Sequence, residues 1–302
     1  GVVATDTASV GASLLYVERP LQVPAELADA IRDVNNTWCR PDGEEMDSPL
    51  ALYRLNSQLS AGFYYRWVWP GGEPDEAWIE ARAAWHRVVR GVLARDREGL
   101  DSPLLVTRAT MAGKLPEAEA AWAEWDAQRA KPAPPVETVW VSDFLVRDAV
   151  AWALERLRAE QPGILWYADN AVGVALRRAG LPVYGAGDTL PETSEGAFVM
   201  ACSAKAFGTG QNLQSWAYNL LLTTPSSASD FEQLVGRTHR AGQLEDEVQV
   251  HYYAHTEHAR KTLRSAANQA RYIEQTTGDR QRLSYGVWAN ATWKQGSFDA
   301  EP

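Results

Sequence analysis

The sequence predicts an α/β fold in which a parallel β-sheet is covered by helices. After a proline-rich stretch at 131–136, short apolar runs alternate with amphipathic helical patterns up to about residue 278. This alternation is typical of parallel strands, because each crossover between them usually contains a helix. The segment before the prolines shows mainly helical periodicity. We therefore expect a mainly helical region at 1–130, a stiff linker at 131–136, an α/β lobe at 137–278 and a tail at 279–302.

The first region carries one short apolar run and several helical patterns. Its run SLLYV predicts a short strand at Ser13–Val17. Helices are expected at Ala25–Val34, 51–69, 74–98 and 116–130. The helix at 51–69 is crowded with aromatic residues: Phe63, Tyr64, Tyr65, Trp67 and Trp69. These rings either form a platform on which bases stack or pack in a core, and we favour core packing.

In the lobe, the expected elements follow one another in a regular order. Strands are expected at Thr138–Val141, Ile164–Ala168, Pro182–Tyr184, Phe198–Cys202, Asn219–Thr223 and Val248–Tyr253. Helices are expected after Ser142, at Ala171–Arg178, at 230–243 and at Glu257–Thr276. Several of the strands are almost entirely apolar, as strands are when helices cover both faces of a sheet.

Composition narrows the classes of function. The chain has 302 residues, of which 45% are hydrophobic and 13 are tryptophan, so a packed globular protein is expected. The net charge of −10 argues against indiscriminate nucleic-acid binding and restricts any DNA contact to a local patch. The two cysteines, Cys39 and Cys202, do not indicate a disulfide framework, so we expect a reducing compartment such as the cytoplasm. No apolar run approaches the roughly 20 residues that span a bilayer, and no membrane partner is expected.

The most informative stretch is DFEQLVGRTHRAGQ, from Asp230 to Gln243. Read as a helix, it places Gln233, Arg237 and Arg240 on one polar stripe. The opposite side carries Phe231, Leu234, Val235 and Thr238. Two guanidinium groups on one anchored element suit a concentrated anion such as a nucleotide triphosphate, because they stay charged and bond oxygens in pairs. The alternative is a surface helix with solvated arginines.

Gln233 to Gln243 resembles the Q-x-x-G-R-x-H-R-x-G-Q signature of the Swi/Snf-like group of superfamily 2 helicases and DNA translocases. The resemblance implies a RecA-like C-terminal helicase lobe. It also implies that Arg240 is an arginine finger that reaches ATP on a neighbouring lobe, and that Arg237 is a second arginine on the phosphate side. Gln233 and Gly236 would then contact the nucleotide, and His239 would contact nucleic acid.

A second stretch, CSAKAFGTGQNL from Cys202 to Leu213, is similar to the penultimate motif of the same family. The resemblance assigns Gly208 and Gly210 to nucleotide binding. It assigns to nucleic-acid binding Ser203, Lys205, Thr209 and Asn212. The family has adjacent glycines and a glycine before Leu-Asn-Leu, whereas this chain has Phe207 and Gln211. Together the matches cover about 137–255.

The sequence lacks the motifs with which a complete ATPase binds nucleotide and magnesium. It contains no G-x-x-x-x-G-K-[ST] loop, and the stretch from Ala112 to Leu115 lacks the first glycine and the hydroxyl residue of that motif. No acidic pair that could hold magnesium follows an apolar strand. The resemblance therefore implies that ATP and Mg²⁺ are bound mainly by an N-terminal phosphate-loop lobe, supplied in cis or in trans. The expected partners are that lobe and DNA, most readily double-stranded.

Three readings of the function remain open from the sequence. The first is the C-terminal lobe of a nucleic-acid-dependent ATPase, inactive as this isolated chain. The second is a non-catalytic module that binds nucleic acid or a partner, and the third is a nucleotide-binding α/β domain with unrelated chemistry. The histidines His251, His255 and His258 are spread over a strand and a helix start, so no metal site is expected.

Overall fold

The computed structural model describes residues 10–46, 48–95, 99–100, 102–195, 198–208 and 210–294. Its contacts divide the chain into two compact units. We call Gly1–Tyr64 with Trp140–Pro302 the sheet unit, and Tyr65–Val139 the helical unit. None of the helices in the described part of the chain combines the length and apolar character needed to cross a membrane.

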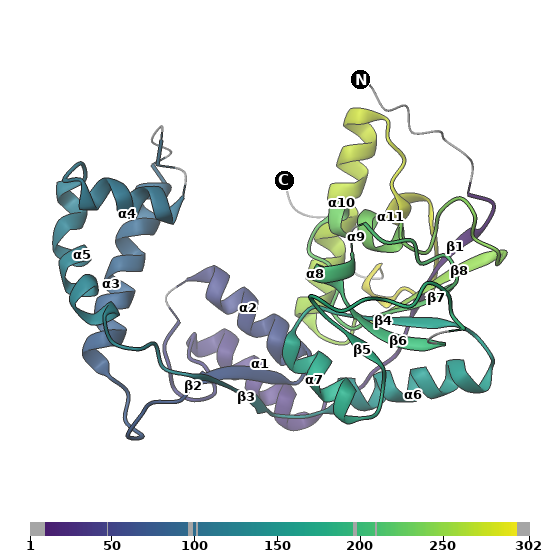
Figure 1. Ribbon diagram of the computed structural model, residues 1–302, viewed down its shortest axis with the longest axis horizontal. Coiled ribbons are helices and arrows are strands. Elements are labelled where there is room, and N and C mark those ends of the chain that lie inside the picture. Colours follow the sequence, from purple (N-terminus) through teal and green to yellow (C-terminus); the bar gives the residue numbers. More distant parts are fainter. Residues whose placement is uncertain are drawn as a thin grey trace. The chain divides into compact units, whose positions relative to one another are not determined.

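The sheet unit is built on a seven-stranded sheet whose hydrogen-bonded neighbours all run parallel (Figure 1). In spatial order its strands are β5 (Val183–Tyr184), β6 (Val199–Ser203), β4 (Gly163–Tyr167), β7 (Tyr218–Leu221), β8 (Glu247–Tyr252), β1 (Ser13–Glu18) and β9 (Val287–Ala289). In the middle of the sheet, Leu165 lies opposite Ala201 on one side and Leu220 on the other. The predicted α/β class with a parallel sheet is confirmed, and this sheet fits the RecA-like lobe that the resemblance implies.

Helices cover both faces of the sheet (Figure 1). On one face lie α6 (Phe144–Arg158) and α7 (Asn170–Arg178), and on the other α9 (Ala228–Val235), α10 (Glu257–Thr277) and α11 (Arg282–Tyr285). The short α8 (Ala204–Phe207) directly follows β6. Strand β4 contacts helices on both faces of the sheet. Ile164 and Trp166 pack in the same core as Phe231 of α9. Gly163 lies so close to α6 that a Cβ on it would be 2.8 Å from the ring of Trp152.

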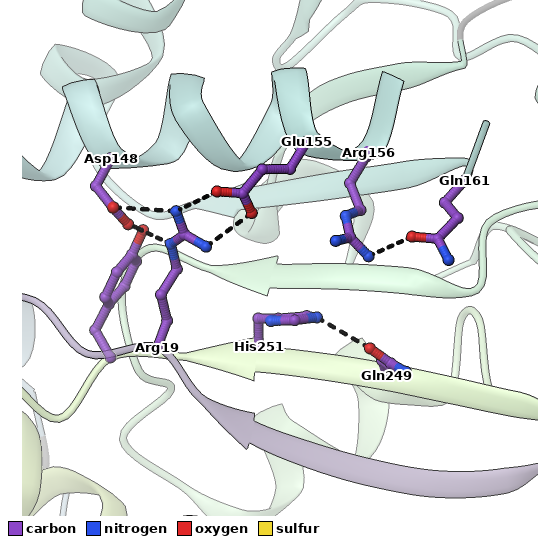
Figure 2. A network of polar contacts seen from close by, with 8 residues as sticks. Arg19, Asp148, Glu155, Arg156, Gln161, Gln249 and His251 are labelled. Carbon is purple, nitrogen blue, oxygen red and sulfur yellow. Dashed lines mark hydrogen bonds and ion pairs between the residues drawn. The ribbon is translucent and has the colours of Figure 1, made fainter. Parts of the chain in front are cut away.

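The N-terminal strand β1 lies between β8 and β9, inside the main sheet. Arg19, just beyond it, bonds two carboxylates of α6: its Nη2 donates to Asp148 Oδ1 over 3.1 Å and its Nη1 to Glu155 Oε2 over 3.0 Å (Figure 2). The hydroxyl of Tyr253 donates to the same Asp148 over 2.7 Å. The strand expected at Ser13–Val17 is thus present, and it belongs to the α/β sheet. It was expected within a mainly helical region at 1–130, and the structure places it between β8 and β9 of the central sheet.

Two further helices of the sheet unit are α1 (Ala25–Thr37) and α2 (Pro49–Ser60). The helix expected over 51–69 was wrong in its second half, where the chain turns and forms β2 (Phe63–Trp67). Gly62 explains the break, because its φ of +93° favours glycine and a Cβ there would lie 2.0 Å from the carbonyl oxygen of Ser142. The aromatic run that follows suits a strand better than a helix.

The helical unit contains α3 (Glu76–Leu93), α4 (Pro103–Met111) and α5 (Pro116–Arg129). Beside them, β2 pairs with β3 (Val136–Trp140) in a separate two-stranded sheet, so the first strand expected for the lobe does not join the main sheet. The indoles of Trp67, Trp69, Trp78 and Trp125 meet edge to face, with centroids 5.1–5.8 Å apart. These ring contacts agree with core packing of the tryptophans that follow Gly62.

The segment expected to be a tail also belongs to the sheet unit as far as residue 294. It forms α11, the edge strand β9 and a short 3-10 helix at Thr292–Lys294. Trp288 stacks on Tyr16 with ring centroids 4.2 Å apart, and the buried Trp293 donates from Nε1 to the hydroxyl of Tyr252 over 3.1 Å. These indoles fix the C-terminal strand beside β1.

Candidate functional site

A pocket of about 480 Å³ opens at the carboxyl edge of the sheet. Its wall includes residues that follow three adjacent strands, namely Ala168 after β4, Ala204 after β6 and Thr223 after β7. The chain leaves β4 toward β5 and β6 but leaves β7 toward β8, so the strand order reverses between β4 and β7. Parallel sheets bind ligands at such a reversal, and the volume lies within the range of roughly 300–1,000 Å³ of small-molecule sites.

Three of the residues selected from the sequence line this pocket: Lys205, Gly208 and Gln233. Lys205 and Gln233 are exposed, whereas Gly208 is buried. A Cβ on Gly208 would lie 2.4 Å from the carbonyl oxygen of Ala204, so a larger residue would displace the short helix α8. Glycine at this position therefore shapes the wall of the pocket.

The arginine stretch begins as a helix and then changes direction. Helix α9 starts at Ala228, with the Ser227 hydroxyl accepting from the Asp230 amide over 3.1 Å. The predicted anchor is present, because the side chains on its inner side are buried: Phe231, Leu234 and Val235. The helix ends at Val235, however, and the helix expected over 230–243 was wrong beyond that point. Arg237 and Arg240 thus lie in turns and not on a helical stripe.

The cause of this change is a buried polar contact. The side chain of Asn219 on β7 donates to the hydroxyl of Thr238 over 3.1 Å, and both residues are almost fully buried. Thr238 is thereby drawn toward the sheet. The preceding Gly236 is tightly packed, since a Cβ there would lie 2.7 Å from the carbonyl oxygen of Glu232 and 3.4 Å from the guanidinium carbon of Arg282. In this structure Gly236, expected at the nucleotide, serves the packing of the turn.

Both arginines meet the loop that follows the glycine turn. Arg237 donates from Nη1 to the carbonyl oxygen of Gln211 over 3.2 Å and from Nε to that of Gln233 over 3.1 Å. Arg240 donates from Nη1 to the Oδ1 atom of Asn212. The structure therefore brings Arg237, Arg240 and Asn212 together, and Gln233 connects them to the pocket wall.

The electrostatic environment of the arginines favours an anion. Burial, followed by the positive charges of Arg240 and Arg282, lowers the pKa of Arg237. Arg282 is paired with Glu232, but in the described part of the chain neither Arg237 nor Arg240 has a carboxylate partner. Two uncompensated guanidinium groups side by side can bind an anion through charge-assisted hydrogen bonds.

Two residues expected to contact nucleic acid lie inside the unit instead. His239 is 2% exposed, and its Nε2 lies 3.0 Å from the carbonyl oxygen of Ala12. Burial lowers the pKa of His239 and favours its neutral form. Ser203 is also buried, and its hydroxyl accepts from the Ala206 amide over 3.4 Å to begin α8. Direct contacts from these two side chains are no longer expected.

The other residues of the glycine turn have different positions. Gly210 is exposed and has a φ of +81°, which favours glycine, and Asn212 is exposed and engaged with Arg240. Thr209 lies outside the described residues. The exposed part of the expected nucleic-acid surface thus consists of Lys205 and Asn212.

The pocket also contains residues that the sequence reading missed. Tyr53 and Ser57 come from α2, far away in the chain, and no motif marks them. Asp230 and the turn from Thr223 to Ser226 line the pocket as well. An apolar strand followed by the polar run TTPSS is a signal that could have placed that turn at the edge of the sheet.

The three histidines near β8 lie apart from this chemistry. His251 Nε2 lies 3.2 Å from Gln249 Oε1, and His255 Nε2 lies 2.8 Å from the carbonyl oxygen of Ser60. Burial lowers the pKa of His251, His255 and His258 to about 4 in each case. Among the residues that the structure describes, no three His, Cys, Asp or Glu side chains are grouped so that they could hold a metal ion.

Comparison with known proteins gives similarities among solved structures only. No protein-family model matches the sequence, and no curated protein matches it. Among solved structures, the C-terminal part of the Fun30 ATPase domain is similar with a TM-score of 0.46 and 11% identity, over 84% of this chain and 89% of that chain. At this TM-score the similarity carries no weight for the site, whose interpretation depends on the geometry of the chain itself.

Proposed function

We propose that the sheet unit is the C-terminal lobe of a nucleic-acid-dependent ATPase of the helicase or DNA-translocase kind. The observation that carries the proposal is the arrangement of Arg237 and Arg240. Both lack a carboxylate partner in the described part of the chain, and both are held against the loop at 211–212. The pocket at the carboxyl edge of the sheet adjoins them through Gln233.

In this proposal each cation has its own task. Arg240 is the arginine finger that stabilises the charge on the phosphoryl group during transfer, and Arg237 binds the phosphates beside it. Gly208 forms the adjoining part of the nucleotide site. Mg²⁺ and most of the ATP contacts come from an N-terminal lobe with a phosphate loop, because this sequence has no such loop. The isolated chain should therefore hydrolyse ATP no faster than background.

DNA is the proposed nucleic-acid partner, and it would contact the exposed residues Lys205 and Asn212. The net charge of −10 means that such contacts must be local. A non-catalytic binding module is the alternative. This alternative is favoured by the side chain of Arg240, because its Nη1 atom is already bonded to Asn212 of the same lobe in this structure.

The test is a binding titration of the purified chain with Mg-ATP and with inorganic tripolyphosphate. Arg237→Ala and Arg240→Ala should each lower the affinity for both ligands at least about fivefold, because a charge-assisted hydrogen bond contributes about 1 kcal/mol or more. Arg147→Ala is the matched control, since Arg147 is an exposed arginine of α6 that is paired with Asp143, the residue before that helix. Unchanged affinity in both site variants, with circular dichroism like that of the wild type, would refute the phosphate site.

Turnover separates the ATPase from the binding module. ATP hydrolysis should appear when a phosphate-loop lobe is supplied together with DNA, and Arg240→Ala should abolish it. DNA binding without any stimulation of hydrolysis in that mixture would favour the non-catalytic module.

A further inference from the structure

One wall of the pocket comes from α2, which lies outside the stretches that resemble helicase motifs. Tyr53 on α2 is the single aromatic residue among the described residues that line the pocket. Tyr53 is 41% exposed, and it forms part of the pocket wall. A large ring presented to a pocket is a surface on which a flat ligand can stack.

The helix that carries Tyr53 is firmly attached to the sheet unit. The hydroxyl of Ser60, at the end of α2, lies 2.8 Å from that of Thr256, and the carbonyl oxygen of Ser60 lies 2.8 Å from His255 Nε2. The ring of Tyr53 also meets that of His258 edge to face, with centroids 4.6 Å apart. The ring is thus held in place before any ligand arrives, which reduces the entropy lost on binding.

Polar residues line the same pocket as this ring. Ser57 lies one helical turn after Tyr53, and Asp230 and Gln233 of α9 line the same pocket. Together they present hydrogen-bond acceptors and donors to the edge of a planar heterocycle. Lys205, also in the lining, provides a positive charge for an attached phosphate.

We propose that the pocket binds a nucleobase that carries phosphate, with the base stacked on Tyr53. The phosphate half of this inference rests on the proposed function, whereas the stacking half rests on the pocket alone. The base can belong to a free nucleotide or to a single-stranded nucleic acid, because both present the same heterocycle. Base stacking on aromatic side chains contributes about 1–3 kcal/mol per base, so loss of the ring should weaken binding roughly tenfold or more.

The experiment compares adenosine, Mg-ATP, tripolyphosphate and a short single-stranded DNA with the full chain. Saturation-transfer NMR reports which ligand protons contact the protein, and titration gives each affinity. Tyr53→Ala should remove saturation transfer to the base protons of adenosine and weaken ATP about tenfold, while the affinity for tripolyphosphate stays unchanged. Tyr53→Phe should bind like the wild type, because it keeps the ring. Tyr272→Ala is the matched control, since Tyr272 is 68% exposed on α10 and does not line the pocket.

Each outcome decides a separate question. Equal loss of ATP and tripolyphosphate in Tyr53→Ala, or no loss of either ATP or adenosine, overturns the stacking inference. Adenosine contacts that depend on Tyr53, without any binding of tripolyphosphate, support the base pocket and refute the phosphate site. A Tyr53-dependent effect on the DNA alone identifies a nucleic-acid base as the source, and one on ATP identifies a free nucleotide.

Discussion

The main-chain amide of Leu213 donates to the carbonyl oxygen of Arg237 over 3.0 Å. This bond joins the loop after the glycine turn to the turn that carries both arginines. The side chain of Gln214 also donates to the carbonyl oxygen of Ala241, and Arg237 itself bonds Gln211. A displacement of this loop must therefore move the arginines. A ligand that contacts Gly210 or Asn212 therefore contacts the loop that holds the proposed finger, Arg240.

The first prediction concerns the finger itself. Arg240→Ala should abolish ATP turnover once a phosphate-loop lobe is supplied, and it should leave the melting temperature nearly unchanged. Folding is preserved because Arg240 lies beyond the buried end of α9 and bonds the exposed Asn212. A positioned guanidinium contributes roughly a thousandfold or more in rate, which is about 4 kcal/mol of barrier.

Arg240→Lys should recover little of that loss, because an ammonium lacks the planar fork that bonds two oxygens. Arg147→Ala, on the exposed side of α6, should keep wild-type turnover. Retention of most activity by Arg240→Ala in single-turnover measurements would show that the finger has been assigned to the wrong residue.

The second prediction concerns DNA. Binding by the isolated chain should be weak and should fall steeply with salt, because the overall charge is −10 and only local contacts are available. Lys205→Ala should reduce the slope of log K against log salt by about one, as expected for the loss of one phosphate contact. Fluorescence anisotropy with a labelled duplex at several salt concentrations measures the slope.

Lys261→Ala, an exposed lysine on α10, is the control for a general change of charge. It should leave the slope unchanged. Tight binding that does not respond to salt would contradict the phosphate contacts and would direct attention to stacking on aromatic side chains.

Much of the lobe could be predicted because its strands are apolar runs separated by helical patterns. The expected strands at Ile164–Ala168 and Val248–Tyr253 differ from β4 and β8 by one residue at each boundary. The buried side of α9 was also predicted, since Phe231, Leu234 and Val235 recur at helical spacing. These features depend on local patterns, which a single sequence contains.

Features that depend on distant parts of the chain could not be predicted. The end of α9 is set by the buried bond between Asn219 and Thr238, which no local pattern shows. The place of β1 in the sheet depends on pairing with β8, more than two hundred residues away. For the same reason Tyr53 was missed at the pocket, because only the folding of α2 against α10 brings it there.

The third prediction tests the polar contact that ends α9. Asn219→Leu should lower the free energy of unfolding by about 2 kcal/mol or more, because the buried indole of Trp166 and hydroxyl of Thr238 lose a hydrogen-bond partner. The Asn219 Oδ1 atom accepts from the indole Nε1 of Trp166 over 3.0 Å, and its Nδ2 donates to Thr238. Urea unfolding followed by far-UV circular dichroism measures the change.

Thr238→Val should lower the free energy of unfolding by less than Asn219→Leu does. In that variant Asn219 Nδ2 can still donate to the carbonyl oxygen of Gln249 over 3.3 Å. Asn268→Ala on the exposed side of α10 should stay within about 0.5 kcal/mol of the wild type. A larger loss in Thr238→Val than in Asn219→Leu would mean that the indole bond contributes little.

The last prediction concerns pH. Burial lowers the pKa of His251, His255 and His258 to about 4, against an ordinary value near 6.5. A lowered pKa means that the unfolded chain takes up protons before the folded chain does as pH falls. The stabilisation by these neutral histidines is therefore complete above about pH 6.5 and is lost as the pH falls toward 4. Between pH 7 and 5, where carboxylates remain mostly ionised, each histidine should lower the free energy of unfolding by up to about 2 kcal/mol.

His251 is the best residue on which to test this dependence. After burial, the nearby charges of Arg156 and Arg19 lower its pKa further, and Glu155 opposes them (Figure 2). His251→Gln cannot take up the proton, so its unfolding free energy should depend less on pH between 7 and 5 than that of the wild type. Asn268→Ala should keep the wild-type dependence. Urea titrations at pH 7 and pH 5 give the difference in unfolding free energy between the two pH values. The same difference for His251→Gln as for the wild type would contradict a lowered pKa of His251 in the folded chain.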